Sequence, residues 1–186
     1  MSLSPCSDTD LWISWDTYHK LIERLALTVH QSGWEFDQIL CLARGGLRVG
    51  DILSRIFQLP LAILSTSSYR EGQGTVQGHL NISQYITMPK DKFFGRVLLV
   101  DDLVDSGVTL QAVKEHLAQH YKAVTEIKTA VLWYKACSKI KPDFFVDFLP
   151  HNPWIHQPFE QYDTLTPAQL EQRSIVEKSM DSESLS

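Results

Sequence analysis

The segment Val97–Leu110, VLLVDDLVDSGVTL, constrains the fold of this 186-residue chain more than any other part. It begins with a short uninterrupted apolar run, Val97 to Val100, which is typical of an inner strand of a parallel sheet. Two adjacent carboxylates, Asp101 and Asp102, come directly after the run, and a turn of small residues then opens a helix. Because open α/β sheets bind their ligands at the carboxyl ends of the strands, the two acids are expected at a ligand site.

The small-residue turn has the composition of an anion-binding loop. Ser106, Gly107, Val108 and Thr109 offer hydroxyls and backbone N–H groups at the start of a helix, where unpaired amides and the helix dipole both favour negative charge. Carboxylates accept the hydroxyls of a sugar, so the segment predicts contacts to a ribose and to its 5′-phosphate. An acid pair alone could be a metal site or solvated charge, but the ordered combination favours the sugar-phosphate site. Neither Gly-x-x-x-x-Gly-Lys nor Gly-x-Gly-x-x-Gly occurs.

The apolar pattern predicts one α/β domain. At 44% hydrophobic residues the chain suits a single core. A helical spacing of apolar residues follows Ser14 or Asp16, either of which can cap the helix. Further helices are expected over 47–57 and 110–121, and strands over 38–43, 61–64, 97–100, 127–133 and 144–148. This alternation with brief links predicts a mainly parallel sheet flanked by helices.

Three segments depart from this rhythm. Residues 1–10 are expected to form a loose N-terminus, residues 11–163 the domain, and residues 164–186 a polar C-terminal extension in which a short helix starts near Pro167. The stretch from Ser65 to Gly95 is rich in glycine and polar residues. A stretch of this length between two strands is typical of a lid, a hairpin or a functional loop.

Charge and cysteine content exclude several classes of protein. The formal net charge of −5 and the lack of a basic run disfavour a nucleic-acid surface. The three cysteines are scattered, which indicates neither a disulfide framework nor a zinc site and favours a reduced, cytoplasmic chain. Since no 18-residue apolar stretch and no signal-peptide pattern occurs, no integral membrane segment is expected.

A second strand–turn–helix junction lies at Leu42–Leu47, LARGGL. The guanidinium of Arg44 presents a fixed fork of donors that suits a phosphate. Gly45 and Gly46 allow backbone amides to approach an anion without a Cβ in the way. Alone this could be a routine turn with an exposed arginine, but beside Asp101–Thr109 it favours a pyrophosphate site.

Two further side chains are candidates for contact with a base. Lys135 follows the predicted strand 127–133 and so belongs at the same sheet edge; its ammonium has only donors and would pair with a 6-oxo group on a purine. Trp154 lies in an irregular segment between two prolines, where an indole could stack on a base. Taken singly, Lys135 is more often a solvated surface residue, and Trp154 more often fills a core.

Together these residues resemble the type I phosphoribosyltransferases, which use phosphoribosyl pyrophosphate (PRPP), and within them the 6-oxopurine branch, most closely the bacterial xanthine-guanine phosphoribosyltransferases. The resemblance runs from about residue 12 to residue 163. Its landmarks are SWD (14–16), RGGL (44–47), SSY (67–69), VDDLVDSGVT (100–109), Lys135 and WIHQPF (154–159). It implies the type I fold with a flexible lid loop and a small hood, a Mg²⁺ cofactor, and a homodimer or homotetramer that takes PRPP and a purine base.

The resemblance also implies a role for each matching residue on the sugar side. Asp101 and Asp102 would hold the ribose hydroxyls and Mg²⁺, and residues 106–109 would bind the 5′-phosphate. Arg44 and Gly45 would contact pyrophosphate through a peptide bond that the family often holds in the cis form.

On the base side, Asp105 would face N7 of the purine and take or polarise its proton. Lys135 would read O6, Trp154 would stack on the ring, and the backbone at Ile155 would read the 2-position. Ser68 and Tyr69 would lead the lid.

The implied reaction is transfer of the 5-phosphoribosyl group from PRPP to N9 of xanthine, guanine or hypoxanthine, as in purine salvage. One alternative is a non-catalytic regulator that senses PRPP or nucleotides on the same fold, because fold alone does not determine function. Another is a transferase for adenine or a pyrimidine. Arg44, Gly45 and Lys135 favour the enzyme, and Lys135 with Trp154 favours a 6-oxopurine.

Overall fold

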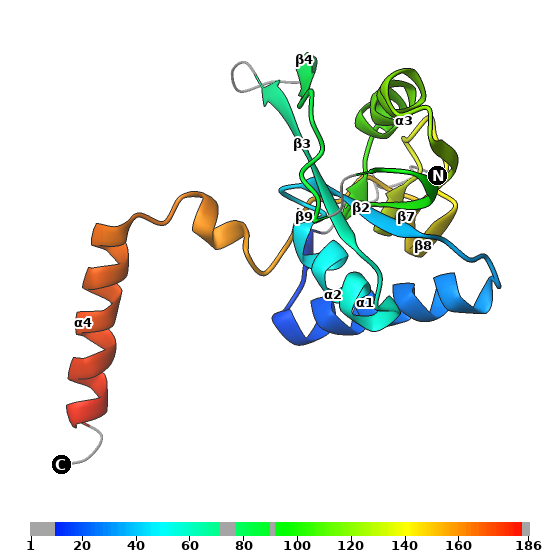
Figure 1. Ribbon diagram of the computed structural model, residues 1–186. Coiled ribbons are helices and arrows are strands. Elements are labelled where there is room, and N and C mark those ends of the chain that lie inside the picture. The colour runs from blue at the N-terminus through cyan, green and yellow to red at the C-terminus, as the bar shows by residue number, and fades with distance from the viewer. Residues whose placement is uncertain (1–9, 71–76, 90–91, 184–186) are drawn as a thin grey trace, which may run out of the picture.

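The computed structural model describes residues 10–70, 77–89 and 92–183 (Figure 1). Its elements in chain order are β1 (Leu11–Trp12), α1 (Trp15–Gln31), β2 (Gln38–Ala43), α2 (Leu47–Phe57), β3 (Leu61–Arg70), β4 (Gln77–Ile82), β5 (Gly95–Val100), β6 (Leu103–Val104), α3 (Val108–His120), β7 (Val124–Lys135), β8 (Phe144–Leu149), β9 (Ile155–His156), the 3₁₀ turn η1 (Glu160–Asp163) and α4 (Pro167–Glu183).

The main sheet is mostly parallel, as the sequence predicts. Its strands run in the order β4-β3-β2-β5-β7-β6, with β8 also pairing with β7. All of these pairs are parallel except β3 with β4. Consequently β2, β5 and β7 all end at one edge of the sheet, which brings Arg44, Asp101 and Lys135 to the same side of the molecule.

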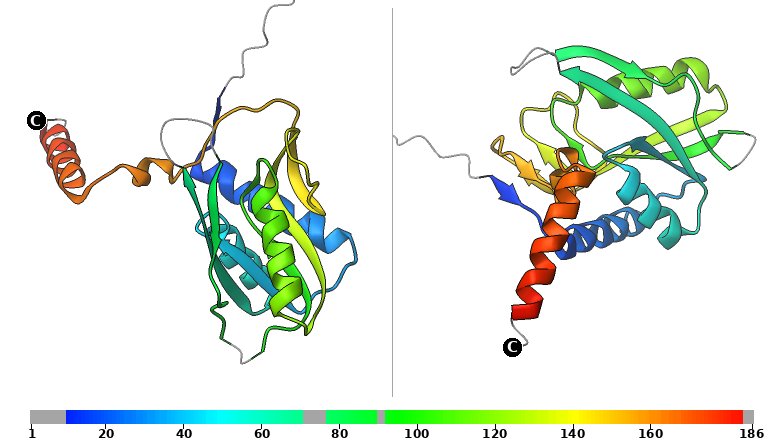
Figure 2. Two further views of the ribbon diagram at one scale, coloured as in Figure 1. Left: turned by 90° about the horizontal axis from the view of Figure 1, so that it is seen from above. Right: turned by 90° about the vertical axis from the view of Figure 1, so that its left-hand side faces the viewer.

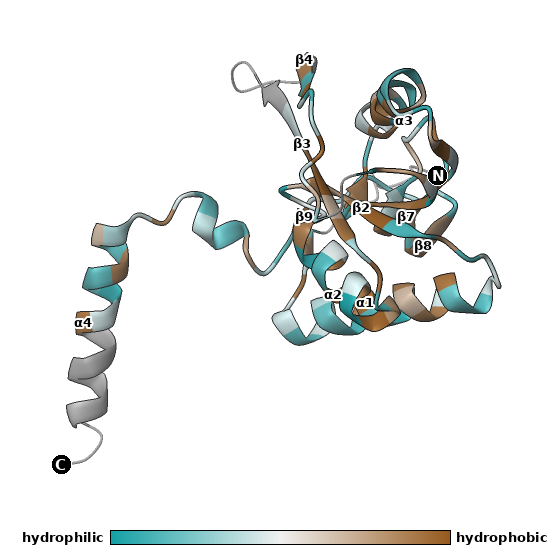
Figure 3. Cartoon of the chain, viewed as in Figure 1, coloured by the Kyte–Doolittle hydropathy of each residue, from teal (hydrophilic) through white to brown (hydrophobic). Residues whose placement is uncertain are grey.

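Helices cover both faces of the sheet. Figure 2 shows α3 on one face and α1 with α2 on the other. Because side chains alternate along a strand, Ile39 and Cys41 of β2 pack in the core under α1 and α2, whereas Leu40 and Leu42 pack in the core under α3. Both cores consist of aliphatic and aromatic side chains, and the burial of both faces explains why the inner strands are continuous apolar runs. In Figure 3 the central strands are accordingly mostly brown.

Ser14, not Asp16, caps α1. Its Oγ accepts a hydrogen bond from the backbone N–H of Thr17 at 3.1 Å. Asp16 instead forms an ion pair with Lys20, one turn further along the exposed face. Both residue types favour a helix start, and the chain places the serine at the position with extended backbone that a cap requires.

The stretch from Ser65 to Gly95 contains a hairpin. β3 continues to Arg70, six residues beyond the predicted end at Leu64, and pairs with the antiparallel β4. In Figure 1 this hairpin stands clear of the two helical layers. The backbone of the predicted lid residues Ser68 and Tyr69 belongs to β3, but their side chains lie outside the described part of the chain.

Three two-residue strands were not predicted, because such short pairings carry no periodicity. β6 extends the sheet beside the end of β7. β1 and β9 form a separate parallel ribbon in which Leu11 faces Ile155 and Trp12 faces His156; this ribbon is the small hood. β7 is also longer than predicted, so that Lys135 is its last residue rather than a residue beyond it.

The C-terminal extension forms a longer helix than predicted. α4 has 17 residues and points away from the rest of the molecule (Figure 1). Residues 167–175 are all exposed, including Leu170 and Ile175. No helix in the described part of the chain has the length and apolar character needed to cross a bilayer.

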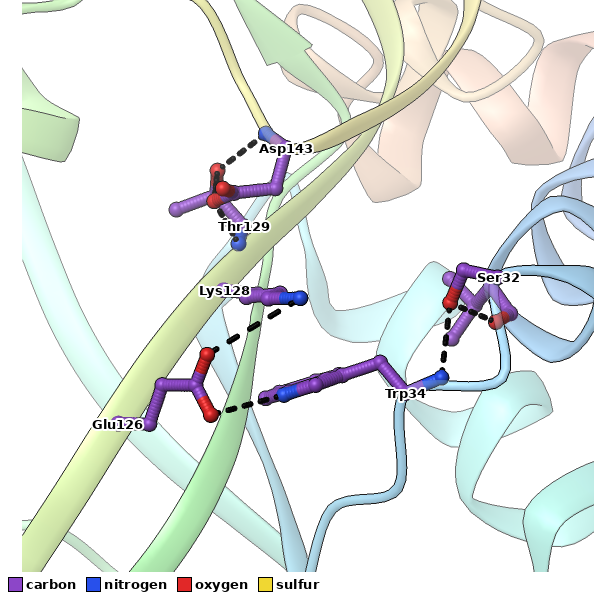
Figure 4. Close-up of polar contacts among 7 residues, drawn as sticks. Ser32, Trp34, Glu126, Lys128, Thr129 and Asp143 are labelled. Atoms are coloured by element: carbon purple, nitrogen blue, oxygen red, sulfur yellow. Dashed lines mark hydrogen bonds and ion pairs between the residues drawn. The ribbon is translucent and has the colours of Figure 1, made fainter.

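A polar cluster links β7 to Asp143 and to Trp34 (Figure 4). The carboxylate of Asp143 accepts hydrogen bonds from the backbone N–H and the hydroxyl of Thr129, both at 2.8 Å. The backbone N–H of Asp143 in turn donates to the Thr129 hydroxyl. Nearby, Trp34 Nε1 donates to Glu126, and the Lys128 ammonium lies 4.9 Å from the centre of the Trp34 ring. The buried N–H and hydroxyl of Thr129 are therefore both paired, as burial requires.

Candidate active site at the carboxyl edge of the sheet

The two adjacent acids lie where β5 ends. The backbone N–H of Asp102 donates to Asp101 Oδ1 at 3.0 Å, and Asp102 Oδ2 accepts from Gln157 Nε2 at 2.5 Å. Removal of the Asp101 carboxyl from water, together with the neighbouring charge of Asp102, raises the pKa of Asp101 well above its usual value. Two half-buried carboxylates at one strand end form an acidic centre that favours a cation or sugar hydroxyls.

The glycine turn after β2 packs directly on this acidic centre. A Cβ on Gly45 would lie 2.5 Å from Asp102 Oδ1, and a Cβ on Gly46 would lie 2.6 Å from the carbonyl oxygen of Val100. A side chain at Gly46 would overlap backbone atoms, and one at Gly45 would displace the Asp102 carboxylate. The cis peptide bond joins Ala43 to Arg44, one bond earlier than the resemblance implied.

Arg44 extends from this turn into solvent, with 86% of its side chain exposed. Its Nη2 forms an ion pair with Asp163 Oδ1 at 3.3 Å. Both residues line a cavity with Gly45, Leu47, Arg48, Phe159 and Tyr162. An exposed guanidinium at the mouth of a cavity can reach an anion without losing a buried partner.

The predicted anion loop opens α3. Gly107 precedes the helix with a φ of +81°, a left-handed conformation that favours glycine. The first N–H groups of a helix have no intrahelical acceptor. The N–H of Val108 donates to Ser106 Oγ at 3.4 Å, and the amides of Thr109 and Leu110 precede the first helical acceptor, so they can turn to a ligand. A backbone hydrogen bond holds the loop in place: the N–H of Lys139 donates to the Ser106 carbonyl oxygen at 3.1 Å. The cavity at this loop is lined by Asp101, Leu103, Val104, Asp105, Ser106, Gly107, Thr109 and Leu110.

We call the cavity at the α3 loop the first cavity; a second cavity adjoins it and shares Leu103 and Asp105 with it. Its lining is Leu103, Asp105, Lys135, Trp154, Ile155, Gln157, Phe159, Glu160 and Asp163. Lys135 is only 5% exposed, so it is not a surface lysine. Its Nζ lies 3.7 Å from Asp105 Oδ1. Trp154 is 48% exposed and lines the cavity, so it does not fill the core.

Four segments therefore bring their predicted residues together at one edge. Residues 44–45 follow β2, residues 101–109 follow β5, Lys135 ends β7, and residues 154–155 lead into β9. The lid residues are the exception, since their side chains are not described. The arrangement offers an acidic centre, an amide loop beside it, and a cavity lined by one ammonium, one indole and three carboxylates, of which those of Asp105 and Asp163 are exposed.

Sequence reasoning missed several polar residues of the site. Gln157 links the hood to the acidic centre, and Glu160 accepts a hydrogen bond from Trp154 Nε1 at 2.7 Å. Cys137 Sγ donates to Asp105 Oδ1 at 3.4 Å; burial and the hydrogen bond to Asp105 raise the pKa of this thiol. Each contact joins segments that no local pattern connects, and the cluster of polar residues after Trp154 was the one available signal.

Comparison with known proteins agrees with this geometry. The family model described as "Phosphoribosyl transferase domain" matches residues 14–164. A xanthine-guanine phosphoribosyltransferase of Gluconobacter oxydans is 31% identical over 156 residues, which are 83% of this chain and 87% of that protein. A corresponding protein of Idiomarina loihiensis is 26% identical over 157 residues, 84% of this chain and 90% of that protein.

Solved structures give the same result. A purine phosphoribosyltransferase from Pyrococcus horikoshii superposes with a TM-score of 0.66 at 28% identity, covering 84% of this chain and 98% of that one. A xanthine-guanine-hypoxanthine phosphoribosyltransferase from Helicobacter pylori superposes with a TM-score of 0.63 at 28% identity, covering 78% and 90%. With its sheet order, its acid pair and amide loop at the strand ends, and a family match over most of its length, this chain belongs to the phosphoribosyltransferase family.

Proposed function

We propose that this protein transfers the 5-phosphoribosyl group of PRPP to N9 of a 6-oxopurine, which yields a nucleoside 5′-monophosphate and pyrophosphate. The observation that carries the proposal is the buried Lys135 ammonium, which shares one cavity with Asp105 and Trp154 beside the amide loop. A buried group with donors only pairs with an oxygen at position 6 and is mismatched with an amino group. The names of the relatives from Gluconobacter oxydans and Helicobacter pylori support the same choice of base.

The sugar and its phosphates fit the residues that surround the first cavity. Carboxylates of Asp101 and Asp102 accept the 2′- and 3′-hydroxyls of the ribose. The hydroxyls and amides of residues 106–109 receive the 5′-phosphate at the start of α3. Arg44 and the Gly45 amide face the pyrophosphate. When pyrophosphate binds, the exposed Arg44 guanidinium leaves its ion pair with Asp163 and pairs with the more highly charged phosphate oxygens.

The donor set of the acidic centre fits Mg²⁺. This ion prefers oxygen ligands and is commonly held by one or two carboxylates together with substrate oxygens and water. Asp101 and Asp102 supply two carboxylates at one strand end, and they are the residues that would hold it. When bound, Mg²⁺ neutralises charge on the departing pyrophosphate.

The chain's own groups account for the remaining chemistry. The bond from C1′ to pyrophosphate breaks largely before the bond to N9 forms, which leaves a cationic ribose. Asp105 takes the proton from N7 of the base while Lys135 fixes O6, and Trp154 and the Ile155 backbone hold the ring. Water must be excluded from this cation, and we assign that task to the hairpin that carries Ser68 and Tyr69.

The test is release of pyrophosphate from PRPP by the purified protein, with guanine, hypoxanthine, xanthine and adenine compared side by side. Turnover with the three 6-oxopurines and none with adenine is expected. Asp105→Asn should lower kcat by about 10²–10⁴-fold while PRPP binding, measured by calorimetry, stays unchanged. Binding of PRPP or nucleotides without turnover on any base would replace the enzyme with a regulator, and preference for adenine would remove Lys135 from base selection.

Three further expectations belong to this proposal: a homodimer or homotetramer, a cytoplasmic location, and recognition of the purine 2-position by backbone groups near Ile155. Sedimentation of the purified protein and the relative rates on the three 6-oxopurines address the first and the last.

A further inference from the structure

Glu160 has the most elaborate polar contacts of the second cavity, and the proposed mechanism does not use it. Its Oε1 accepts from Trp154 Nε1 at 2.7 Å, and its Oε2 lies 2.7 Å from His156 Nδ1. Glu160 begins η1, while the other two residues flank the start of β9. One carboxylate thus connects the indole in the cavity to a histidine of the hood.

His156 has a second carboxylate on its other side. Its Nε2 lies 3.1 Å from Asp10 Oδ2, just ahead of β1. The Trp12 ring of β1 stacks on the imidazole, with 3.8 Å between ring centres. Among the described residues, Asp10 and Glu160 are the charged groups within hydrogen-bond distance of this ring. Because a carboxylate only accepts, both contacts are hydrogen bonds only when both ring nitrogens carry protons, and these two carboxylates raise the pKa of His156.

We propose that Glu160 is a positioning residue for purine recognition: its carboxylate fixes the plane of the Trp154 indole, and protonated His156 holds that carboxylate in place from the hood. The inference rests on the proposed function, since it concerns the base that Trp154 would stack on.

The need for such a clamp follows from the exposure of Trp154. Nearly half of this side chain is in solvent, and the residues before it form no regular element. An indole in that setting can adopt several rotamers, whereas stacking on a flat base requires one plane. A charge-assisted hydrogen bond to Nε1 removes that freedom before the base arrives.

The experiment compares KM for guanine, KM for PRPP and kcat in Glu160→Ala, Trp154→Phe and the double variant. Loss of one charge-assisted hydrogen bond should raise KM for guanine about tenfold in Glu160→Ala, with kcat and KM for PRPP within about twofold. In Trp154→Phe, which lacks the indole N–H, removal of Glu160 should add little, so that the two changes are not additive. Gln161→Ala, on the same exposed turn, is the matched control.

Glu160→Gln separates positioning from a structural role. The amide oxygen can still accept from Trp154, and the amide N–H₂ can donate to a His156 that carries a single proton facing Asp10. This variant should therefore keep a KM for guanine close to that of the natural protein.

The same variant should change the pH profile. In the natural protein KM for guanine should rise as the pH increases through the raised pKa of His156. Above that pKa the imidazole keeps one proton, so one of its nitrogens faces a carboxylate oxygen without a proton between them and the hold on Glu160 weakens. In Glu160→Gln and in His156→Phe that rise should be absent. Since all variants use the same base over the same pH series, ionisation of guanine itself cancels in the comparison.

The outcomes separate this inference from the proposed function. An unchanged KM in Glu160→Ala, or full additivity with Trp154→Phe, overturns the inference while turnover by the natural protein leaves the proposed function intact. Absence of turnover in the natural protein overturns the proposed function and this inference with it.

Discussion

Alanine at Gly46 and alanine at Gly45 should damage the protein in different ways, although the two positions are adjacent. At Gly46 the added Cβ would lie 2.6 Å from the Val100 carbonyl oxygen and 2.9 Å from that of Leu42. These atoms belong to the ends of β5 and β2, which cannot shift without disturbing the parallel ladder. At Gly45 the nearest atoms belong to the Asp102 carboxylate, a side chain that can rotate away.

The magnitude follows from the kind of atom that must move. Overpacking against fixed backbone costs about 3 kcal/mol, the upper end of the usual range, which for a chain of this length lowers Tm by about 6–12 °C. Gly45→Ala should cost about 1 kcal/mol and lower Tm by about 2–4 °C. Gly45→Ala should nevertheless abolish most transferase activity. Rotation of the Asp102 side chain breaks its hydrogen bond with Gln157 and moves a carboxylate that we assign to the ribose hydroxyls.

Thermal and urea unfolding followed by circular dichroism measure both variants. Arg55→Ala, which removes an exposed ion pair on α2, the helix that follows the two glycines, is the control and should stay within about 0.5 kcal/mol of the natural protein. The reasoning would be refuted if Gly46→Ala had the same Tm as the natural protein, or if alanine at Gly45 lowered stability more than alanine at Gly46. In either case Gly46 would not be the glycine that the fold requires.

Other predictions concern single contacts. Gln58 ends α2 in a left-handed conformation with φ of 55°, so Gln58→Gly should raise the free energy of unfolding by up to about 1 kcal/mol in urea titrations. Asp143→Ala should cost about 1–3 kcal/mol in the same assay, because it leaves the buried Thr129 N–H and hydroxyl without their shared acceptor. Lys135→Met should lower kcat/KM for guanine by about 10²-fold and narrow the preference over adenine, which competition between the two bases measures. Chelation of Mg²⁺ by EDTA should stop turnover, and added Mg²⁺ should restore it, with circular dichroism unchanged throughout.

The sequence alone determined the fold class and the segments of the site. Apolar runs such as Val97–Val100 predict buried parallel strands because both faces of such a sheet are covered. The turn after Asp102 predicts an anion loop because small residues before a helix leave amides exposed. These signals are local, so each can be read from a few consecutive residues, and the parallel sheet then brings the strand ends to one edge.

Which side chains meet at that edge depends on contacts between segments that are distant in the chain. Burial of Lys135 beside Asp105, the bond from Gln157 to Asp102, and the contacts of Glu160 join residues from different segments of the chain, and the two-residue strand β1 exists only because β9 lies beside it. α4 continues well past the expected short helix although residues 167–175 are exposed. Such contacts depend on where distant segments lie after folding, and the periodicity of a single segment contains no information about that.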